Sequence, residues 1–298
     1  MPVRSLGYLR LGVADLPAWE RFAGEFLGLM PVEGDDPQHR YFRMDDYPPR
    51  LVLTPAAESG LGAVGLEVGN AKELAELVAN VEASGTKVRA LDDTEARERR
   101  ITAGVAFDDP AGNPFEAFYG PVLNHRSAVL PTVSAFVTGD QGMGHLIVTA
   151  ADGPALFAFY TDVLGFVERN TMRLPAAPAA DGSPQFQTMW FLGCNPRHHT
   201  LGIMPMPGPP RLIHFMVEAS RIDDVGRAID RADKLDIPVM QTLGRHTNDH
   251  MVSFYVLSPD GFPVEFGFDG LRVGPDEPTY EITEGAFWGH KFLNAPKF

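Results

Sequence analysis

The sequence predicts an α+β protein made of two similar domains, each containing two modules rich in β-α-β segments. The first observation is an internal repeat, because Gly7-Tyr8-Leu9 recurs 137 positions later as Gly144-His145-Leu146. The second is a shared order of elements, since each copy begins with strand-like residues and continues into an amphipathic helix. The third is length, because 298 residues suffice for two domains that each bury a core. The chain is therefore expected to hold four modules in two copies.

Two helices are predicted in each copy. In the first, apolar residues recur at helical spacing between Trp19 and Leu27, and again between Leu156 and Leu164. Gly28 and Gly165 follow at once, where a glycine commonly ends a helix. The second helix is expected at 71–84 in the first copy and at 223–234 in the second. Strands are expected to follow these helices, at 104–107 and 114–118 in the first copy and at 252–257 and 264–268 in the second.

The two copies meet near residues 120–140. We expect an N-terminal domain without metal over 1–130, a C-terminal catalytic domain over 131–272 and a closing segment over 273–298. Between aligned positions the second copy is longer by 12 residues, and the Pro/Ala/Gly-rich stretch 174–184 predicts a surface loop there. This loop either flanks a functional site or is a tolerated insertion, and the sequence favours neither.

Composition limits the class of protein. With 44% hydrophobic and 21% charged residues the chain is an ordinary globular protein, and a net charge of −14 argues against nucleic acid as a partner. The single cysteine, Cys194, allows no internal disulfide and fits a reducing compartment. No leader-like N-terminus and no apolar run of membrane-spanning length is present, so we expect a cytoplasmic protein with no membrane partner.

Aligning the copies suggests a metal site in the second one. The spacing of 51 residues from Gly65 to Glu116 equals that from His214 to Glu265. The alignment therefore gives two corresponding triads, Tyr8, Gly65 and Glu116 in the first copy and His145, His214 and Glu265 in the second. Two histidines and one carboxylate are typical of non-heme Fe(II) oxygenases, although Zn(II) and Mn(II) accept the same donors. The second half is therefore predicted to carry the chemistry.

Strand alternation supports this interpretation. Around His214, the alternate residues Ile213, Phe215 and Val217 are expected to share the packing face, which leaves the histidine on the other face. Glu265 likewise lies opposite an apolar face, and a carboxylate buried there requires a cation. The alternative is a set of hydrogen-bonded core histidines with a salt-bridged glutamate. Three such residues at corresponding positions, with six of the nine histidines in the second copy, favour the metal.

Further motifs accompany the triad. A glycine stands two residues before a histidine in Gly244-Arg245-His246, and Tyr255 precedes the turn Ser258-Pro259. Another block, from Cys194 to Thr200, contains His198-His199. With these motifs in register over nearly the whole chain, the sequence resembles the type I extradiol ring-cleavage dioxygenases of the vicinal oxygen chelate superfamily. The resemblance is strongest to two-domain enzymes that cleave 2,3-dihydroxybiphenyl or a steroid catechol, and it implies two βαβββ modules per domain, a glyoxalase-like fold.

The resemblance also implies roles for individual residues. Fe(II), in preference to Mn(II), would be held by the triad and would face open positions for a catechol and O₂. His199 would act as acid and base, since the pKa of a histidine lies near the working pH. His246 and Tyr255 would hydrogen-bond the catechol oxygens, and Tyr255 would also serve as an acid. Both atoms of O₂ would enter beside the diol, giving a ring-opened keto-acid in aromatic catabolism.

Neighbouring residues are predicted to support this set. On an extended strand His198 would point away from His199, so we give it a supporting role. Asn248 and Asp249 either orient His246 or only form a turn, and the sequence favours neither. Three further histidines have no metal-like surroundings in the sequence and are left out of the site: His39, His125 and His290.

The expected substrate is a catechol with a bulky 3-substituent, biphenyl-like or steroid-like, with small alkylcatechols second. Methionine and phenylalanine residues of the second copy predict a roomy apolar pocket, or else plain core: Met172, Phe186, Met189, Phe191, Met204, Met206, Phe215 and Met216. A glyoxalase-type isomerase or thiol transferase is the main alternative function, and a metal-free antibiotic-sequestering protein is another. Neither of these functions requires His199, His246 and Tyr255 together. A homo-oligomer is expected by analogy, and Glu116 is expected to pair with a basic residue.

Overall fold

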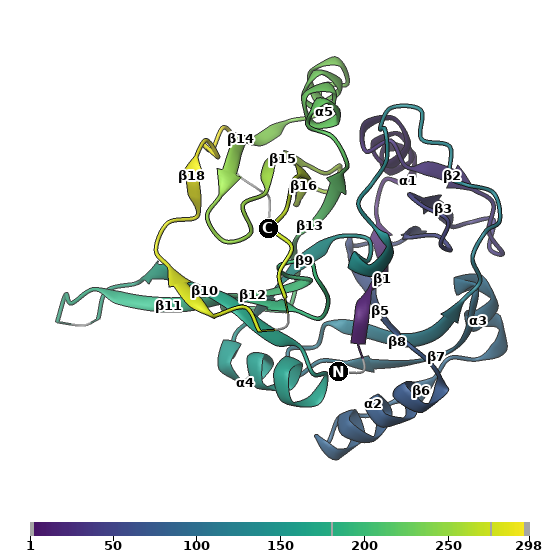
Figure 1. Cartoon of the computed structure of the whole chain (residues 1–298), viewed down its shortest axis with the longest axis horizontal. Helices are drawn as coiled ribbons and strands as arrows, with labels where there is room; N and C mark the ends of the chain where they lie inside the picture. The colour runs from purple at the N-terminus through teal and green to yellow at the C-terminus, as the bar shows by residue number, and fades with distance from the viewer. Residues whose placement is uncertain (1–2, 180, 275, 295–298) are drawn as a thin grey trace.

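The computed structural model describes residues 3–179, 181–274 and 276–294 and contains one β-sheet in each half of the chain (Figure 1). The N-terminal half contains strands β1 (Val3–Val13), β2 (Met30–Val32), β3 (Arg40–Arg43), β4 (Leu51–Pro55), β5 (Gly60–Val68), β6 (Arg89–Ala90), β7 (Ile101–Asp108) and β8 (Pro114–Pro121). Its helices are α1 (Leu16–Arg21), the π-helix η1 (Phe22–Phe26), α2 (Ala71–Ala83) and α3 (Asp93–Arg99).

The C-terminal half repeats the order of the eight strands and adds two short strands at its end. Its strands are β9 (His145–Ala150), β10 (Val167–Ala176), β11 (Gln185–Gly193), β12 (Leu201–Pro205), β13 (Leu212–Ala219), β14 (Val239–His246), β15 (Val252–Leu257), β16 (Pro263–Phe268), β17 (Tyr280–Ile282) and β18 (Ala286–Trp288). Its helices are the 3-10 turn η2 (Gly139–Gln141), α4 (Gly153–Ala158), the π-helix η3 (Phe159–Val163) and α5 (Ile222–Lys234).

Each half is built from two βαβββ modules, in which the last strand returns in parallel beside the first. This pairing joins β1 to β4, β5 to β8, β9 to β12 and β13 to β16, and the first strands of the two modules pair antiparallel. The strand orders are β2-β3-β4-β1-β5-β8-β7-β6 and β17-β10-β11-β12-β9-β13-β16-β15-β14-β18. The predicted α+β class and its duplicated modules are therefore confirmed.

The first helix of each copy begins with the same local signal. Asp15 and Asp152 each accept a hydrogen bond at 3.0 Å from the backbone N–H three residues later, and a proline lies in the first turn. Each helix then widens into a π-helix, which the hydrophobic spacing did not predict. The predicted glycines end both helices, and their φ angles of 77° at Gly28 and 80° at Gly165 are accessible because glycine lacks a Cβ.

The two π-helices exchange aromatic contacts between the halves. Phe26 of η1 packs on Phe266 of the second sheet, with ring centroids 6.3 Å apart. In return, Tyr160 of η3 packs on Phe115 at 5.7 Å and donates a hydrogen bond of 2.6 Å to Asp109. Both halves therefore contribute to one continuous hydrophobic core. The chain crosses from one sheet to the other between β8 and β9, the interval that contains the predicted boundary at 130.

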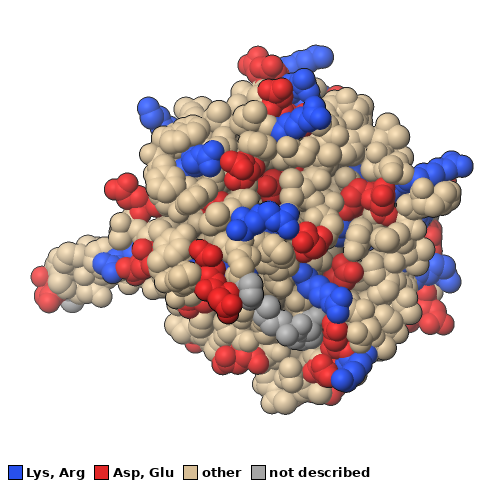
Figure 2. All heavy atoms as spheres, viewed as in Figure 1, with Lys and Arg blue, Asp and Glu red and all other residues tan. Residues whose placement is uncertain are grey.

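Most of the stretch predicted as a surface loop, 174–184, is the connection of a β-hairpin. Strands β10 and β11 pair out to Ala176 and Gln185, so only residues between these two connect them. The hairpin projects from the body of the molecule at the left of Figures 1 and 2. Acidic and basic side chains are dispersed over the face shown in Figure 2. Among the described residues, no helix is long and apolar enough to cross a membrane.

The closing segment after residue 272 joins the two edges of the second sheet. Strand β17 pairs in parallel with β10, and β18 pairs antiparallel with β14, at the opposite edge of the sheet order. Only three residues separate β17 from β18, so the sheet must curl until its edges approach each other. The segment, yellow in Figure 1, therefore closes the concave face on which the candidate site lies.

Candidate active site

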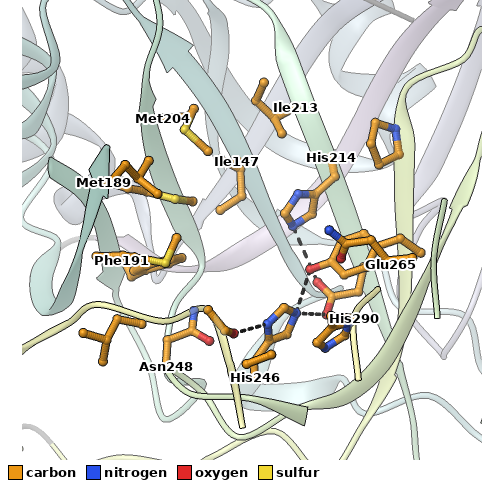
Figure 3. Close-up of a pocket in the computed structure, with 18 of the residues that line it drawn as sticks. Ile147, Met189, Phe191, Met204, Ile213, His214, His246, Asn248, Glu265 and His290 are labelled. Carbon is orange, nitrogen blue, oxygen red and sulfur yellow. Dashed lines mark hydrogen bonds and ion pairs between the residues drawn. The ribbon is translucent and has the colours of Figure 1, made fainter. Parts of the chain in front are cut away.

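Three adjacent strands at the centre of the second sheet bring together His145, His214 and Glu265. His145 begins β9, His214 lies on β13 and Glu265 lies on β16, and these strands are neighbours in the sheet. Met216 of β13 stands opposite both His145 and Glu265 in the two registers. Residues distant in sequence therefore meet on one face, as the sequence predicted, and Figure 3 shows His214 directed at Glu265.

The donor atoms of this triad have the spacing that a metal requires. The Nε2 atom of His145 lies 3.2 Å from Nε2 of His214 and 3.1 Å from Oε2 of Glu265, while His214 Nε2 lies 3.5 Å from the same oxygen. Bonds from a metal to nitrogen or oxygen are about 2.0–2.2 Å long, so neighbouring ligands of an octahedral site are roughly 3 Å apart. The three atoms therefore match one triangular face of such a site.

Burial of Glu265 shows that this group needs a cation. Its side chain is 1% exposed, and its Oε2 atom accepts no hydrogen bond from any described residue. Burial alone would raise the pKa of Glu265, but contacts with His145, His214 and His246 hold this pKa well below its usual range. A buried carboxylate with an unsatisfied oxygen facing two imidazoles fits a divalent metal ion.

A β-bulge corrects one detail of the predicted strand. The register between β13 and β9 shifts between Leu212 and His214, so strict alternation fails there. Ile213 therefore does not share the packing face with Phe215, as alternation predicted. It lines the same cavity as His214 instead, whereas Phe215 and Val217 remain in the core.

His246 and Tyr255 face the triad from the outer side. The Tyr255 hydroxyl lies within hydrogen-bond distance of Nε2 of His246, at 2.8 Å, and this nitrogen lies 3.3 Å from Oε1 of Glu265. Burial and the charge of Glu265 raise the pKa of Tyr255 well above its ordinary value, so the phenol keeps its proton. Ser253, on the same strand face, donates a hydrogen bond of 2.5 Å to Glu265 and fixes its orientation.

His199 lies on the opposite side of the triad. Its ring packs against that of His145 with centroids 4.0 Å apart, and its Nδ1 atom lies 3.7 Å from Asp249 and 3.2 Å from Nδ1 of His198. Burial, with the neighbouring His145 and His198, lowers the pKa of His199 well below 6.5, so its imidazole is neutral at pH 7. Both adjacent histidines lie in the loop between β11 and β12, not on the extended strand that the sequence suggested.

Asn248 and Asp249 do not have the role expected for them as partners of His246. The Nδ1 atom of His246 contacts the carbonyl oxygen of Gly285 at 2.9 Å, and neither of the two predicted residues bonds to this imidazole. Asp249 faces His199 instead. The sequence could not indicate this, because Gly285 belongs to the closing segment and acts only through its backbone.

The metal triad and the second group of polar residues line one cavity of about 580 Å³. The second group consists of His199, His246 and Tyr255. One wall is apolar, as Figure 3 shows for Ile147, Met189, Phe191, Met204 and Ile213, opposite the polar residues around Glu265. Five side chains of the predicted Met/Phe set line it: Met172, Met189, Phe191, Met204 and Met206. The other three do not, because Phe186 is 58% exposed and Phe215 and Met216 are buried elsewhere.

His290 was wrongly left out of the site. Its ring lines the cavity and stacks on His246 with centroids 4.0 Å apart and an angle of 18° between the planes. Figure 3 shows the two rings side by side. Nothing near His290 in the chain suggests a site, because it lies in the closing segment outside the repeated part of the sequence.

The first sheet shows that one predicted repeat position is shifted. Tyr8 stands opposite Gly65, and Gly65 stands opposite Glu116, just as Met216 stands opposite His145 and Glu265. Gly65 therefore corresponds to Met216. The position of His214 is held by Ala63, which pairs with Arg10 as His214 pairs with Ile147. Ala63 and Glu116 are 53 residues apart, whereas His214 and Glu265 are 51 apart, so equal spacing selected a residue two positions too late in the first copy.

Comparisons with known proteins agree with this geometry. The model of the Glyoxalase/Bleomycin resistance protein/Dioxygenase superfamily matches residues 142–266, and the model of dihydroxybiphenyl dioxygenase BphC D1 matches residues 6–55. The iron-dependent extradiol dioxygenase of Rhodococcus jostii (strain RHA1) is 43% identical over 98% of both chains. Biphenyl-2,3-diol 1,2-dioxygenase of Paraburkholderia xenovorans (strain LB400) is 39% identical over 98% of this chain and 96% of the relative.

A solved structure extends the similarity to the whole fold. The crystal structure of BphC, a halotolerant catechol dioxygenase, superimposes with a TM-score of 0.90 at 34% identity, over 98% of this chain and 95% of the other. The fold and the triad thus define a member of the glyoxalase and dioxygenase superfamily. Within it, the chain belongs to the extradiol ring-cleavage dioxygenases.

Proposed function

We propose that this enzyme cleaves the ring of a catechol with a bulky 3-substituent, using Fe(II) held by His145, His214 and Glu265. The observation that carries the proposal is the convergence of two polar sets on one cavity. The triad offers three donor atoms on one side, and His199, His246 and Tyr255 surround the space in front of it. An isomerase or a binding protein of this superfamily has no use for the second set.

Fe(II) bound to the triad would supply open coordination positions for the catechol oxygens and for O₂ and would lower the pKa of the bound diol. His199 is neutral and buried, so it can take up the second catechol proton and later return it. Asp249, 3.7 Å from its Nδ1, stabilises the imidazolium that forms.

His246 and Tyr255 orient the substrate in this scheme. The Gly285 carbonyl accepts only, so Nδ1 of His246 carries a proton. Burial alone would lower the pKa of His246, but contacts with Glu265, Asp249 and the Gly285 carbonyl raise it to about 9. The raised pKa of Tyr255 keeps its hydroxyl protonated, as a donor requires. These two side chains would hydrogen-bond the catechol oxygens and release one proton to the opening ring. Both atoms of O₂ then reside in the ring-opened keto-acid.

The size and lining of the cavity support a bulky substituent. A volume of about 580 Å³ lies within the range of sites that enclose drug-sized ligands. The side chains beyond the triad are mostly apolar, so they favour an aryl or polycyclic group over a charged one. Relatives at 34–39% identity are named for biphenyl-2,3-diol, 3-methylcatechol and 1,2-dihydroxynaphthalene, so a small alkylcatechol is the second candidate.

The test is turnover under defined conditions. Protein purified without oxygen and loaded with Fe(II) is mixed with 2,3-dihydroxybiphenyl in air-saturated buffer. We expect a yellow product with one O₂ consumed per substrate, and a higher kcat/KM than with 3-methylcatechol. Bound iron without colour or O₂ uptake on any 3-substituted catechol would contradict ring cleavage and would direct attention to isomerase substrates.

We also propose a cytoplasmic homo-oligomer. Cys194 is a buried free thiol, which suits a reducing compartment. The closing segment exposes several large apolar side chains, which suit contact with a second copy: Phe287, Trp288, Phe292 and Leu293. Light scattering of the purified protein distinguishes an oligomer from a 32.6 kDa monomer.

A further inference from the structure

We propose that His290 is a positioning residue, which holds His246 by stacking on its face while Gly285 of the same segment holds its edge. The closing segment would then be part of the catalytic apparatus and not only a cover. This inference rests on the proposed ring cleavage, because it assigns a function to the orientation of His246.

The edge contact comes from the pairing of β18 with β14. His246 stands opposite Ala286, and Arg245 stands opposite Trp288, so the backbone of the segment runs directly beside the imidazole. The Gly285 carbonyl accepts from Nδ1 at 2.9 Å. This contact keeps a proton on Nδ1 of His246, but a single hydrogen bond leaves the ring able to tilt about its axis.

The face contact removes that freedom. His290 stacks at 4.0 Å between centroids and 18° between planes, and its ring lies 5.8 Å from that of Tyr255. Neither ring nitrogen of His290 has a hydrogen-bond partner among the described residues, although both are buried. Burial and the neighbouring His246 lower the pKa of His290 to about 4, so the ring is neutral at pH 7. It therefore acts through its flat surface.

Two glycines allow the rings to approach this closely. A Cβ at Gly244 would lie 2.5 Å from the backbone nitrogen of His290 and 2.6 Å from its ring. A Cβ at Gly289, where φ is 76°, would lie 2.1 Å from the carbonyl oxygen of Leu243. The glycine two residues before His246, noted in the sequence, thus has a physical explanation, since it makes room for His290.

Clamping the ring has a consequence for catalysis. With its face and edge both fixed, His246 keeps Nε2 aligned with the Tyr255 hydroxyl, 2.8 Å away, and with the cavity. Loss of the stack would allow the ring to rotate out of this alignment. Misplacing a catalytic group in this way slows turnover by about 10–100-fold, a range also found when supporting residues of a metal site are removed.

The experiment compares three variants with the Fe(II)-loaded wild type on 2,3-dihydroxybiphenyl. His290→Ala removes the stacking surface, and we expect kcat to fall about 10–100-fold with KM changed by less than about threefold. His290→Phe keeps a flat ring without nitrogens and should restore most of kcat. The control is Phe287→Ala, on the same segment but 60% exposed and in edge-to-face contact with His250, not with His246. It should resemble the wild type.

A second measurement does not depend on turnover. In the full-length protein loaded with Zn(II), which is diamagnetic, ¹⁵N spectra of labelled histidines report the hydrogen bond that Nδ1 of His246 makes. We expect one form with this hydrogen bond in the wild type and in His290→Phe, and exchange between forms in His290→Ala and in Gly244→Ala, whose Cβ displaces His290.

The outcomes separate this inference from the function. If wild-type protein cleaves no catechol, the proposed function fails, while the spectra still test whether His290 and Gly285 hold the ring of His246. If wild-type protein is active and His290→Ala changes neither kcat nor the spectra, the positioning role of His290 is refuted. A raised KM with unchanged kcat, shared by Phe287→Ala, would also refute it, because that pattern indicates general loosening of the segment.

Discussion

Arg99 donates two hydrogen bonds to Glu116, at 2.6 and 2.5 Å, at the position of the first sheet that corresponds to Glu265 in the second. The hydroxyl of Tyr8, which replaces His145, also donates to this carboxylate. The guanidinium thus supplies the positive charge that a metal ion would supply in the other half. The expected pairing of Glu116 with a basic residue is confirmed, and the first copy holds an ion pair at the place where the second copy holds its triad.

Replacing Arg99 should therefore destabilise the fold while leaving chemistry intact. Arg99 and Glu116 are only 8% and 7% exposed, so Arg99→Met leaves a buried carboxylate without its cation. We expect the free energy of unfolding in urea to fall by about 3–5 kcal/mol. Arg97→Met, which breaks an exposed pair with Asp35, should cost under about 1 kcal/mol. Equal stability of the two variants would show that the buried pair contributes nothing.

Comparison of the two halves shows what the sequence could establish. The repeat placed His145 and Glu265 correctly, because equivalent strands of duplicated modules occupy equivalent places in a sheet. It misplaced Gly65, because spacing along the chain adds up every length change between two strands, whereas register depends on local pairing. The bulge before His214 could not be predicted either, because the alternation of side chains between two faces assumes continuous pairing of the strand with its neighbour.

Contacts made through the closing segment were beyond sequence reasoning. Gly285 contributes only a carbonyl oxygen, and His290 contributes a ring face, so neither leaves a pattern of polar residues in the chain. The segment itself was expected, but its attachment to β10 and β14 follows from the curl of the whole sheet. Residue types predict the chemistry of a site better than they predict which backbone supports it.

Stability should depend on pH through Glu98. Burial alone would raise the pKa of Glu98, but contacts with Arg10, His39 and Tyr41 lower it to about 2. The unfolded value is about 4.3, so the folded state favours the charged form. The resulting stability is present above that value and is lost as the pH falls toward 2. Allowing for partial exposure, we expect about 1–2 kcal/mol.

The comparison with Glu98→Gln isolates this effect from other acid-sensitive groups. At pH 7 the variant should be less stable than the wild type by the amount above, measured by urea unfolding of the metal-free protein. Below pH 4 the difference should shrink. A difference that stays constant from pH 7 to pH 3 would mean that the charge of Glu98 does not matter.

The proposed ligands predict a loss of metal without a loss of fold. His214→Ala removes one of three donors, so we expect less than stoichiometric iron by elemental analysis and no ring cleavage. Its circular dichroism should match the wild type, because the side chain faces the cavity and not the core. His125→Ala, at an exposed histidine, is the control and should retain iron. Full iron content in His214→Ala would exclude this residue as a ligand.

His199 should affect turnover and not metal binding. His199→Phe keeps a ring of similar shape against His145 but cannot transfer a proton. We expect iron content to remain stoichiometric and kcat for 2,3-dihydroxybiphenyl to fall by about 10²–10⁴-fold, the usual contribution of a general acid or base. Wild-type rates in this variant would remove His199 from the proton-transfer scheme, whereas lost iron would indicate a role in holding the metal.

The apolar wall should determine which catechols fit. Met204 lies on that wall, away from the triad in Figure 3, and Met204→Trp would fill part of the space meant for a 3-substituent. We expect kcat/KM for 2,3-dihydroxybiphenyl to fall at least about tenfold relative to 3-methylcatechol, since a few buried carbon atoms are worth about 1–3 kcal/mol. The smaller substrate serves as the internal control, because it reports damage to the metal site itself. Equal losses for both substrates would mean that the ring substituent lies elsewhere in the cavity.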